Sequence, residues 1–361
     1  MCKNQCEVLC KRKAKCNCFR KCAHFERRSC PTVMRAPYVC NACEKKGGCR
    51  RDKYYYRAQI SYDEYREELV SARAGINLDQ EELYKVDALL SPLIKAGQPI
   101  SHIYAYRGHE IPFCKRTLYN HVANHVLSVK SHDLARKVRY KPRKKHKQPA
   151  KDRAYRIGRT FSDFGRFMAL NPDVRIVEMD TVIGAQSASS NVLLTMLFRW
   201  LNLMLVFLMP DKSQDSVKAV FDKLIKDLGS ETFKEIFPLF LTDNGSEFMN
   251  WQDYLTDEHG ELLSEIFFCD ANASYQKGRI EKNHEYLRYI LPKGTSFENL
   301  TDEKVILIMN HINSTARPSL GGETPMGLSL KLLPTEFFVM LGLKGVKPEK
   351  VQLTPSLIKT L

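Results

Sequence analysis

Five short apolar runs constrain the fold of this chain more than any other feature of its sequence. Each has the length of a buried strand, and the second and third are close enough to be joined by a tight turn. Helical spacing separates the third run from the fourth and also follows the fifth. This order predicts an α/β fold in which a mixed sheet is flanked by helices. The predicted strands are 174–183, 192–199, 202–208, 238–242 and 265–269, and the predicted helices are 213–228 and 277–290.

The second and third runs together could be mistaken for a membrane span, because they extend from Val192 to Met209. Arg199 and Asn202 lie near the centre, and a charged residue there costs about 2.5–3.5 kcal/mol on insertion scales. Two buried strands explain the run better. The chain opens on Met1 and a polar, cysteine-rich stretch, so no signal peptide is visible. We therefore expect a cytoplasmic protein with no membrane partner.

Three acidic residues fall where this fold would bring them together. Asp180 lies in the first predicted strand, Asp243 ends the fourth, and Glu281 lies in the helix after the fifth. Carboxylates are the hard oxygen ligands that Mg²⁺ and Mn²⁺ prefer. Two such ions roughly 3.5–4 Å apart activate a nucleophile and stabilise the leaving oxygen of a phosphodiester. The sequence therefore predicts a two-metal site that acts on nucleic acid.

Each of these carboxylates has a competing interpretation. Glu178 lies two residues before Asp180 and shares its strand face, so either could be the ligand, and we favour Asp180. The stretch around Asp243 could be a simple Asp-Asn-Gly turn, and Glu247 is a neighbouring candidate. Glu285 lies one helical turn after Glu281 and competes with it for the third place.

Ten of the twelve cysteines lie before residue 50. In a reducing cytosol this density favours metal over disulfides, and residues 1–55 have too little apolar surface for a core of their own. The two clearest patterns, which predict structural Zn²⁺ ligands, are Cys40, Cys43 and Cys49, and Cys16, Cys18 and Cys22. An iron–sulfur cluster, or disulfides in an exported chain, are the alternatives. The spacing does not assign the ligands to sites.

Residues 56–128 predict a charged connecting helix and then three helices with the spacing of a helix-turn-helix unit. A plain helical bundle is the alternative. The last helix, about 114–124, carries side chains that can reach bases and phosphates. The residues concerned are Lys115, Arg116, Thr117 and Asn120.

Basic residues are concentrated in a linker, residues 129–160, and the whole chain has a formal net charge of +15. Such a tether can follow a DNA backbone and release counterions, although a solvated linker is the alternative. We expect phosphate contacts from Arg143, Lys144 and Lys145 in the linker, and from Lys277 and Arg279 beside Glu281. DNA is thus the predicted partner.

At these residues the chain resembles the bacterial insertion-sequence-30 family of transposases, in the retroviral-integrase-like DDE group. The resemblance runs from the cysteine-rich segment to the closing segment. It rests on Val177-Glu-Met-Asp-Thr-Val-Ile-Gly184, Leu241-Thr-Asp-Asn-Gly-Ser-Glu-Phe248, Phe268-Cys-Asp-Ala-Asn-Ala-Ser-Tyr-Gln-Lys277 with Glu281, Leu291-Pro-Lys-Gly-Thr-Ser-Phe297, Asn313-Ser-Thr-Ala-Arg-Pro318 and Glu323-Thr-Pro-Met326.

The resemblance implies an RNase H-like integrase core at residues 161–332, with Asp180, Asp243 and Glu281 as its metal-binding triad. It also implies binding to terminal inverted repeats and target DNA, a homo-oligomer in the DNA complex, and a location at the bacterial nucleoid. The segment 333–361 is expected to be a helix followed by an extended tail.

The chain departs from the family pattern in two respects that bear on function. The stretch between Asp243 and Glu281 is longer than usual, with the extra residues expected around 251–262. A further helix-turn-helix normally precedes the cysteine-rich segment, so an N-terminally truncated copy is expected. The sequence therefore predicts a DNA transposase that cleaves element ends and joins the 3′-OH to target DNA. The alternative is a catalytically impaired protein that only binds DNA.

Overall fold

The computed structural model describes residues 30–49, 51–72, 76, 78–135, 154–185, 191–257, 259–271 and 273–359. The chain divides into two compact units, Met1–Asp79 and Gln80–Leu361, each described here by itself. Linker residues 136–153 and the cysteines before residue 30 lie outside the described residues.

The first unit contains a short 3-10 helix, η1 (Glu44–Lys46), and the helix α2 (Ala58–Ala72), none of whose residues is buried. Cys40 is the residue that organises the turns before α2. Its N–H donates to the carbonyl of Tyr54 at 2.5 Å, and the Tyr54 N–H donates back to Cys40 Sγ at 3.4 Å. With so little buried apolar surface, local hydrogen bonds of this kind hold the described part of the unit together.

The second unit begins with three helices, α3 (Gln80–Lys95), α4 (Ile100–Arg107) and α5 (Lys115–Ala123). They pack around a hydrophobic cluster of their own. Its most deeply buried members lie at helical spacing, which is why one face of each helix turns inward. They include Leu90, Ile94, Ile103, Leu118 and Val122.

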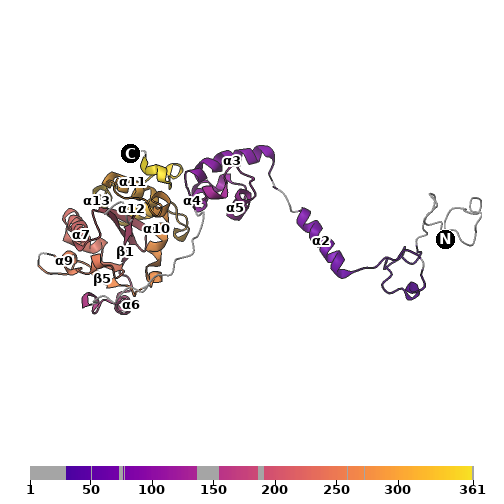
Figure 1. The fold of residues 1–361 in the computed structure, drawn as a ribbon, viewed down its shortest axis with the longest axis horizontal. Coiled ribbons are helices and arrows are strands. Elements are labelled where there is room, and N and C mark those ends of the chain that lie inside the picture. Colours follow the sequence, from indigo (N-terminus) through magenta and orange to yellow (C-terminus); the bar gives the residue numbers. More distant parts are fainter. Residues whose placement is uncertain are drawn as a thin grey trace, which may run out of the picture. The chain divides into compact units, whose positions relative to one another are not determined.

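A mixed sheet forms the centre of the second unit (Figure 1). It has five strands in the order β3-β2-β1-β4-β5. The first three strands pair antiparallel, and β4 and β5 add to β1 in parallel. The α/β sheet predicted from the apolar runs is confirmed. The bounds are β1 (Ile176–Ile183), β2 (Val192–Phe198), β3 (Leu203–Met209), β4 (Leu239–Thr242) and β5 (Glu265–Phe268).

Helices cover both faces of the sheet, as alternating strand residues require. Leu239, Leu241 and Phe267 turn toward α6 (Phe161–Leu170), whereas Phe240 and Phe268 belong to the main core on the other face. Figure 1 shows the sheet between α6 and α11. The remaining helices are α7 (Gln214–Leu228), α8 (Ser230–Ile236), α9 (Gln252–Leu255), α10 (Gly278–Ile290), α11 (Asp302–Asn313), α12 (Pro325–Leu332) and α13 (Thr335–Met340), with short 3-10 turns between them.

The segment after residue 333 is packed as part of the core, although the sequence suggested only a helix and an extended tail. Leu343, Val351, Leu353 and Leu357 are buried in the main hydrophobic cluster. The same segment also binds the three-helix part. The side-chain amide of Gln98 donates to the carbonyls of residues 348, 349 and 351, and the Leu353 N–H donates to the carbonyl of Ala96.

No helix in the described ranges combines the length and apolar character needed to cross a membrane. The run from Val192 to Met209 forms β2 and β3.

A buried carboxylate fixes α10 to the sheet. Glu178 is 1% exposed, its Oε1 accepts from Arg199 Nε at 2.8 Å, and its Oε2 accepts from the backbone N–H of Ile280 at 2.6 Å. The first turn of a helix has unpaired N–H groups and a partial positive charge, so a carboxylate is stabilising there. Both oxygens of Glu178 are therefore used in holding the fold.

We expect Glu178→Ala to lower the free energy of unfolding by about 3 kcal/mol, because it leaves Arg199 and a helix N–H without their partner. Tryptophan fluorescence during urea unfolding reports this unit, since Trp200 and Trp251 are the two tryptophans of the chain. Glu231→Gln, at an exposed position of α8, is the matched control and should change stability by less than about 0.5 kcal/mol. An equal, small effect of both substitutions would contradict this role of Glu178.

Candidate active site

Asp180 and Asp243 lie on neighbouring parallel strands. Asp180 is in β1, where it pairs with Thr195 of β2, and Asp243 directly follows β4, the strand on the other side of β1. A buried lysine, Lys277, reaches both from the turn that precedes α10. Its Nζ lies 3.5 Å from Asp180 Oδ2 and 3.7 Å from Asp243 Oδ2.

Lys277 is only 4% exposed, so its charge depends on these partners. Its ammonium also donates to the carbonyl of Met179 at 3.1 Å. The sequence suggested a phosphate contact for this residue. The structure instead turns its ammonium toward oxygen atoms of the protein, between the first two predicted carboxylates.

Burial raises the pKa of Asp180 above its usual value, because the charged carboxylate loses hydration. Lys277 opposes this shift, and the negative charge of Asp243 adds to it. The Thr181 N–H also donates to Asp180 Oδ1 at 2.9 Å. The site thus places two carboxylates and one cation in a region where water screens charge poorly.

Glu281 comes from the face of α10 that is turned toward β1 and β2. Residues three or four apart on a helix share a face, and Glu281 shares one with Lys277, His284 and Arg288. His284 Nε2 lies 2.9 Å from Thr195 Oγ1, and Arg288 Nη2 donates to the carbonyl of Ile183 at 3.2 Å. Glu281 itself is exposed. Because its helix neighbours His284 and Arg288 contact β2 and β1, Glu281 lies on the side of α10 that is turned toward these strands.

Two other acids near the site are held by the protein. Both oxygens of Glu178 accept hydrogen bonds, one from Arg199 and the other from the first turn of α10. Glu247 is 1% exposed, accepts from Thr181 Oγ1 at 2.7 Å and pairs with Lys212 Nζ at 3.2 Å. A Cβ at Gly245 would lie 2.5 Å from Glu247 Oε2, so a larger residue there would displace the Glu247 carboxylate. Both acids brace the strands that carry the site.

His284 contributes to the site as a neutral group. Burial, with smaller effects of Lys277 and Arg288, lowers its pKa to about 4. The Thr195 hydroxyl donates a hydrogen bond to the carbonyl of Asp180 at 2.9 Å. A neutral imidazole protonated on Nε2 can donate a hydrogen bond to the oxygen of the same hydroxyl. This chain of contacts ties α10 to β2 and β1 at the level of the carboxylates. Sequence reasoning missed this contact, because a histidine among charged and polar residues such as Lys282, Asn283 and Glu285 is typical of a solvated helix face.

Metal binding would require some movement of these side chains. No three His, Cys, Asp or Glu residues within the described ranges already form a group that could hold a metal ion.

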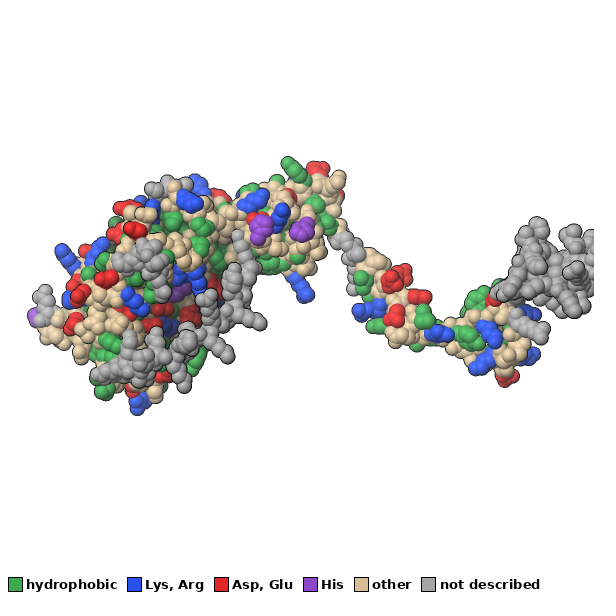
Figure 2. Space-filling view, in the orientation of Figure 1, with side chains coloured by type: hydrophobic (Ala, Val, Ile, Leu, Met, Phe, Trp, Pro, Cys, Tyr) green, Lys and Arg blue, Asp and Glu red, His purple; other side chains and the backbone are tan. Residues whose placement is uncertain are grey.

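Most of the predicted DNA-binding residues that the structure describes are exposed to solvent. On α5, Lys115, Arg116 and Asn120 are exposed and Thr117 is half-buried. Figure 2 shows basic side chains on the surface of this three-helix part. Arg279 is exposed on α10, and its guanidinium donates to the carbonyl of Arg199. The predicted contacts at Arg143, Lys144 and Lys145 fall outside the described residues.

Four cysteines of the first unit line one small cavity of about 20 Å³. Three of them, Cys40, Cys43 and Cys49, form one of the two patterns predicted from sequence, and Cys30 joins them. Hydrogen bonds from Thr32 lower the pKa of the Cys30 thiol. The other pattern, Cys16, Cys18 and Cys22, lies outside the described residues.

No family model matches the chain. Among known proteins, it is 27% identical over 217 residues to a protein of Spiroplasma virus SpV1-R8A2 B named as an ORF3 integrase, covering 58% of this chain and 61% of that one. It is 25% identical over 206 residues to a protein of Streptococcus salivarius named as a transposase for the element IS1161, covering 56% and 54%. It is 28% identical over 92 residues to the transposase of IS4351 from Bacteroides fragilis, covering 26% and 27%.

The chain is related to integrases and insertion-sequence transposases. It spans less than two thirds of each of these relatives. Two solved structures also align with it at 16% identity. One is a simian T-cell lymphotropic virus intasome with a PP2A regulatory subunit (TM-score 0.34, covering 44% of this chain and 55% of that one). The other is the BIV integrase catalytic core domain (TM-score 0.30, covering 43% and 93%).

Replacing Lys277 by methionine should destabilise the protein in a pH-dependent way. Without the ammonium, the buried Asp180 carboxylate loses its main counter-charge, and its pKa, already raised, rises further. A raised folded-state pKa of an acid costs stability as pH increases, so the loss should grow from pH 4.5 to pH 7. We expect about 2 kcal/mol at pH 7, less than for a fully buried pair because Asp243 is 48% exposed.

The measurement is urea unfolding followed by tryptophan fluorescence between pH 4.5 and 8. Lys218→Met is the control, because Lys218 pairs with Asp222 on the exposed face of α7. A loss for Lys277→Met that is independent of pH, or no larger than that of the control, would show that the ammonium does not balance Asp180.

Proposed function

We propose that this chain is a DDE transposase of the insertion-sequence-30 type, with an RNase H-like core, which cleaves the ends of its element and joins the freed 3′-OH to target DNA. The observation that carries the proposal is the cation held by Asp180 and Asp243, with Glu281 on the adjoining face of α10. Kinship with integrases and transposases supports the reaction class.

The donor set fits Mg²⁺ or Mn²⁺. Asp180, Asp243 and Glu281 offer carboxylate oxygens, and Lys277 shows that positive charge is stabilised between the first two. Two bound ions would supply activation of the attacking oxygen and stabilisation of the leaving oxygen of a phosphodiester. The 3′-OH and water are then the nucleophiles, so the reaction needs no serine or tyrosine nucleophile from the chain.

The residues around the triad set its geometry. Glu178 anchors the first turn of α10, and His284 holds Thr195 beside the backbone of Asp180. These contacts fix the position of the helix that carries Glu281. Lys277 balances the aspartates, and when a metal takes that role its ammonium becomes available to a phosphate oxygen of the substrate.

The substrates in this proposal are terminal inverted repeats and a target duplex. The helices α3–α5 act as a helix-turn-helix unit that reads DNA through Lys115, Arg116, Thr117 and Asn120. The basic linker, with Arg143, Lys144 and Lys145, follows the backbone. Because two element ends must be brought together in one complex, we expect a homo-oligomer in the DNA complex, by analogy with this class of enzymes.

Three isosteric substitutions test the triad. Asp180→Asn, Asp243→Asn and Glu281→Gln should each reduce Mn²⁺-dependent cleavage of DNA carrying the element ends by at least about 100-fold, because each removes an anionic ligand. DNA binding, measured by fluorescence anisotropy, should stay within about twofold for all three. Glu285→Gln is the matched control one helical turn after Glu281, and it should keep most of the activity.

Cleavage near the wild-type level in any of the three variants would remove that residue from the triad. Loss in Glu285→Gln with activity retained in Glu281→Gln would move the third place to Glu285. Salt-sensitive DNA binding by the wild-type protein without cleavage in Mg²⁺ or Mn²⁺ would favour the alternative function, a catalytically impaired transposase that only binds DNA.

We also propose a structural Zn²⁺ site in the first unit, held by Cys40, Cys43 and Cys49 with Cys30 as the fourth thiolate. The four thiols line one cavity, and hydrogen bonds to Cys30 lower the pKa of its thiol and so favour the thiolate. The thiols would have to rotate toward the ion. Binding would then supply the folding free energy that a segment with so few buried residues lacks.

Zinc content tests this site. Purified wild-type protein should retain Zn²⁺ through dialysis, and Cys40→Ser or Cys30→Ser should lose about one equivalent relative to it. Cys114→Ser is the control, because Cys114 is exposed at the start of α5, far from the first unit in sequence. Equal zinc in all variants, measured by mass spectrometry of the metal, would exclude these ligands.

A further inference from the structure

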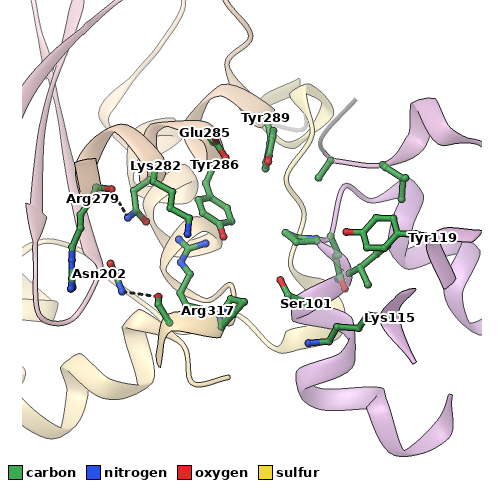
Figure 3. A pocket seen from close by; sticks show the side chains of 18 residues that line it. Ser101, Lys115, Tyr119, Asn202, Arg279, Lys282, Glu285, Tyr286, Tyr289 and Arg317 are labelled. Atoms are coloured by element: carbon green, nitrogen blue, oxygen red, sulfur yellow. Dashed lines mark hydrogen bonds between the residues drawn. The ribbon is translucent and has the colours of Figure 1, made fainter. Parts of the chain in front are cut away.

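We propose that the cavity between α5 and α10 binds a phosphodiester of the DNA backbone, so that α10 contacts DNA on a face next to the one that carries Glu281. This inference rests on the proposed DNA binding of the chain and adds a contact surface to it. The cavity has a volume of about 440 Å³, and its walls come from the three-helix part on one side and from α10 and residues 317–319 on the other (Figure 3).

Positive charge dominates the cavity. Its lining contains four basic side chains, and Glu285 is the one acidic side chain among the lining residues. Lys115 enters from α5, whereas the other three are on the opposite wall, and Figure 3 shows Lys115 pointing into the gap. Cations facing one another across a gap repel, and an anion between them removes that repulsion. The other three basic residues are Arg279, Lys282 and Arg317.

Arg317 brings a buried positive charge to the cavity, and no carboxylate in the described part of the chain forms an ion pair with it. It is 3% exposed, and its guanidinium carbon lies 3.4 Å from the centre of the Tyr286 ring. Its Nη2 donates to the carbonyl of Ile312, but Nε and Nη1 have no hydrogen-bond partner. Burying an arginine in this state is costly, and a nearby anion would lower that cost.

The shape and lining of the cavity favour a DNA backbone over a small free anion. The cavity is larger than a single phosphate group requires, and tyrosines stand on both walls, Tyr119 on α5 and Tyr289 on α10. Tyrosine hydroxyls and rings contact phosphate and sugar in DNA complexes. Leu134 and Ala135 line the rim, and the strongly basic stretch from Arg136 to Arg153 follows them in sequence.

Two neighbouring residues of α10 lie on different faces of the helix, one turned toward the strands and the other toward the cavity. Glu281 shares its helix face with Lys277 and His284, which contact the strands, whereas Lys282 lines the cavity on another face. DNA bound by α5 would thereby be fixed in position relative to the site of cleavage.

Lys115→Ala and Lys282→Ala, singly and together, test the proposal on the full chain. Binding to an element-end duplex is measured by fluorescence anisotropy between 0.05 and 0.3 M salt. Loss of one phosphate contact should raise Kd about fivefold to tenfold near 0.1 M salt and reduce the salt slope by about one. The double variant should bind more tightly than the product of the single effects predicts, because both lysines hold the same phosphate. Lys226→Ala, exposed on α7, removes the same charge away from the cavity and should bind as the wild type does.

Other results would overturn the proposal in distinguishable ways. If the wild type binds no duplex even at low salt, the proposed function and this inference both fail. Single variants that bind DNA as tightly as Lys226→Ala, while only their affinity for inorganic phosphate falls, would show a free-anion site. Single effects that simply multiply would show two separate phosphate contacts and no phosphate shared within the cavity.

Discussion

The ammonium of Lys277 between Asp180 and Asp243 is the interaction on which the candidate site depends. Two carboxylates on adjacent strands repel, and the cost rises where water is excluded. Lys277 offsets that repulsion from a buried position in the turn before α10. The same arrangement therefore stabilises the sheet and places a positive charge between the two carboxylates.

Three contacts near this pair fix the position of α10 against the strands. Glu178 accepts from the first turn of the helix, His284 reaches the Thr195 hydroxyl, and Arg288 reaches the carbonyl of Ile183. These three contacts lie along one face of α10, with Glu281 between them. Because the helix is fixed at several points, the backbone position of Glu281 is fixed as well, although its side chain is exposed.

The sheet could be predicted from the sequence because its strands are short, mostly apolar segments, and the end of α10 because Pro292 follows it. The contacts that build the site could not. The pairing of Glu178 with Arg199 and the position of Lys277 depend on strand register and on the packing of α10, which no local pattern encodes.

The C-terminal segment escaped prediction for a similar reason. Its buried residues, Leu343, Val351, Leu353 and Leu357, follow neither helical nor strand periodicity. They are buried by partners distant in sequence, and Gln98 binds the carbonyls of the same segment from the three-helix part. The cavity beside α10 likewise exists only once that part and the sheet-containing part have come together.

The most direct test of the account is a crystal structure of the protein soaked in Mn²⁺, with anomalous scattering used to locate the ions. The account predicts anomalous peaks bounded by carboxylate oxygens of Asp180, Asp243 and Glu281, with the Lys277 ammonium displaced from both aspartates. Full retention of the Lys277 contacts, with no anomalous peak at these carboxylates, would contradict it.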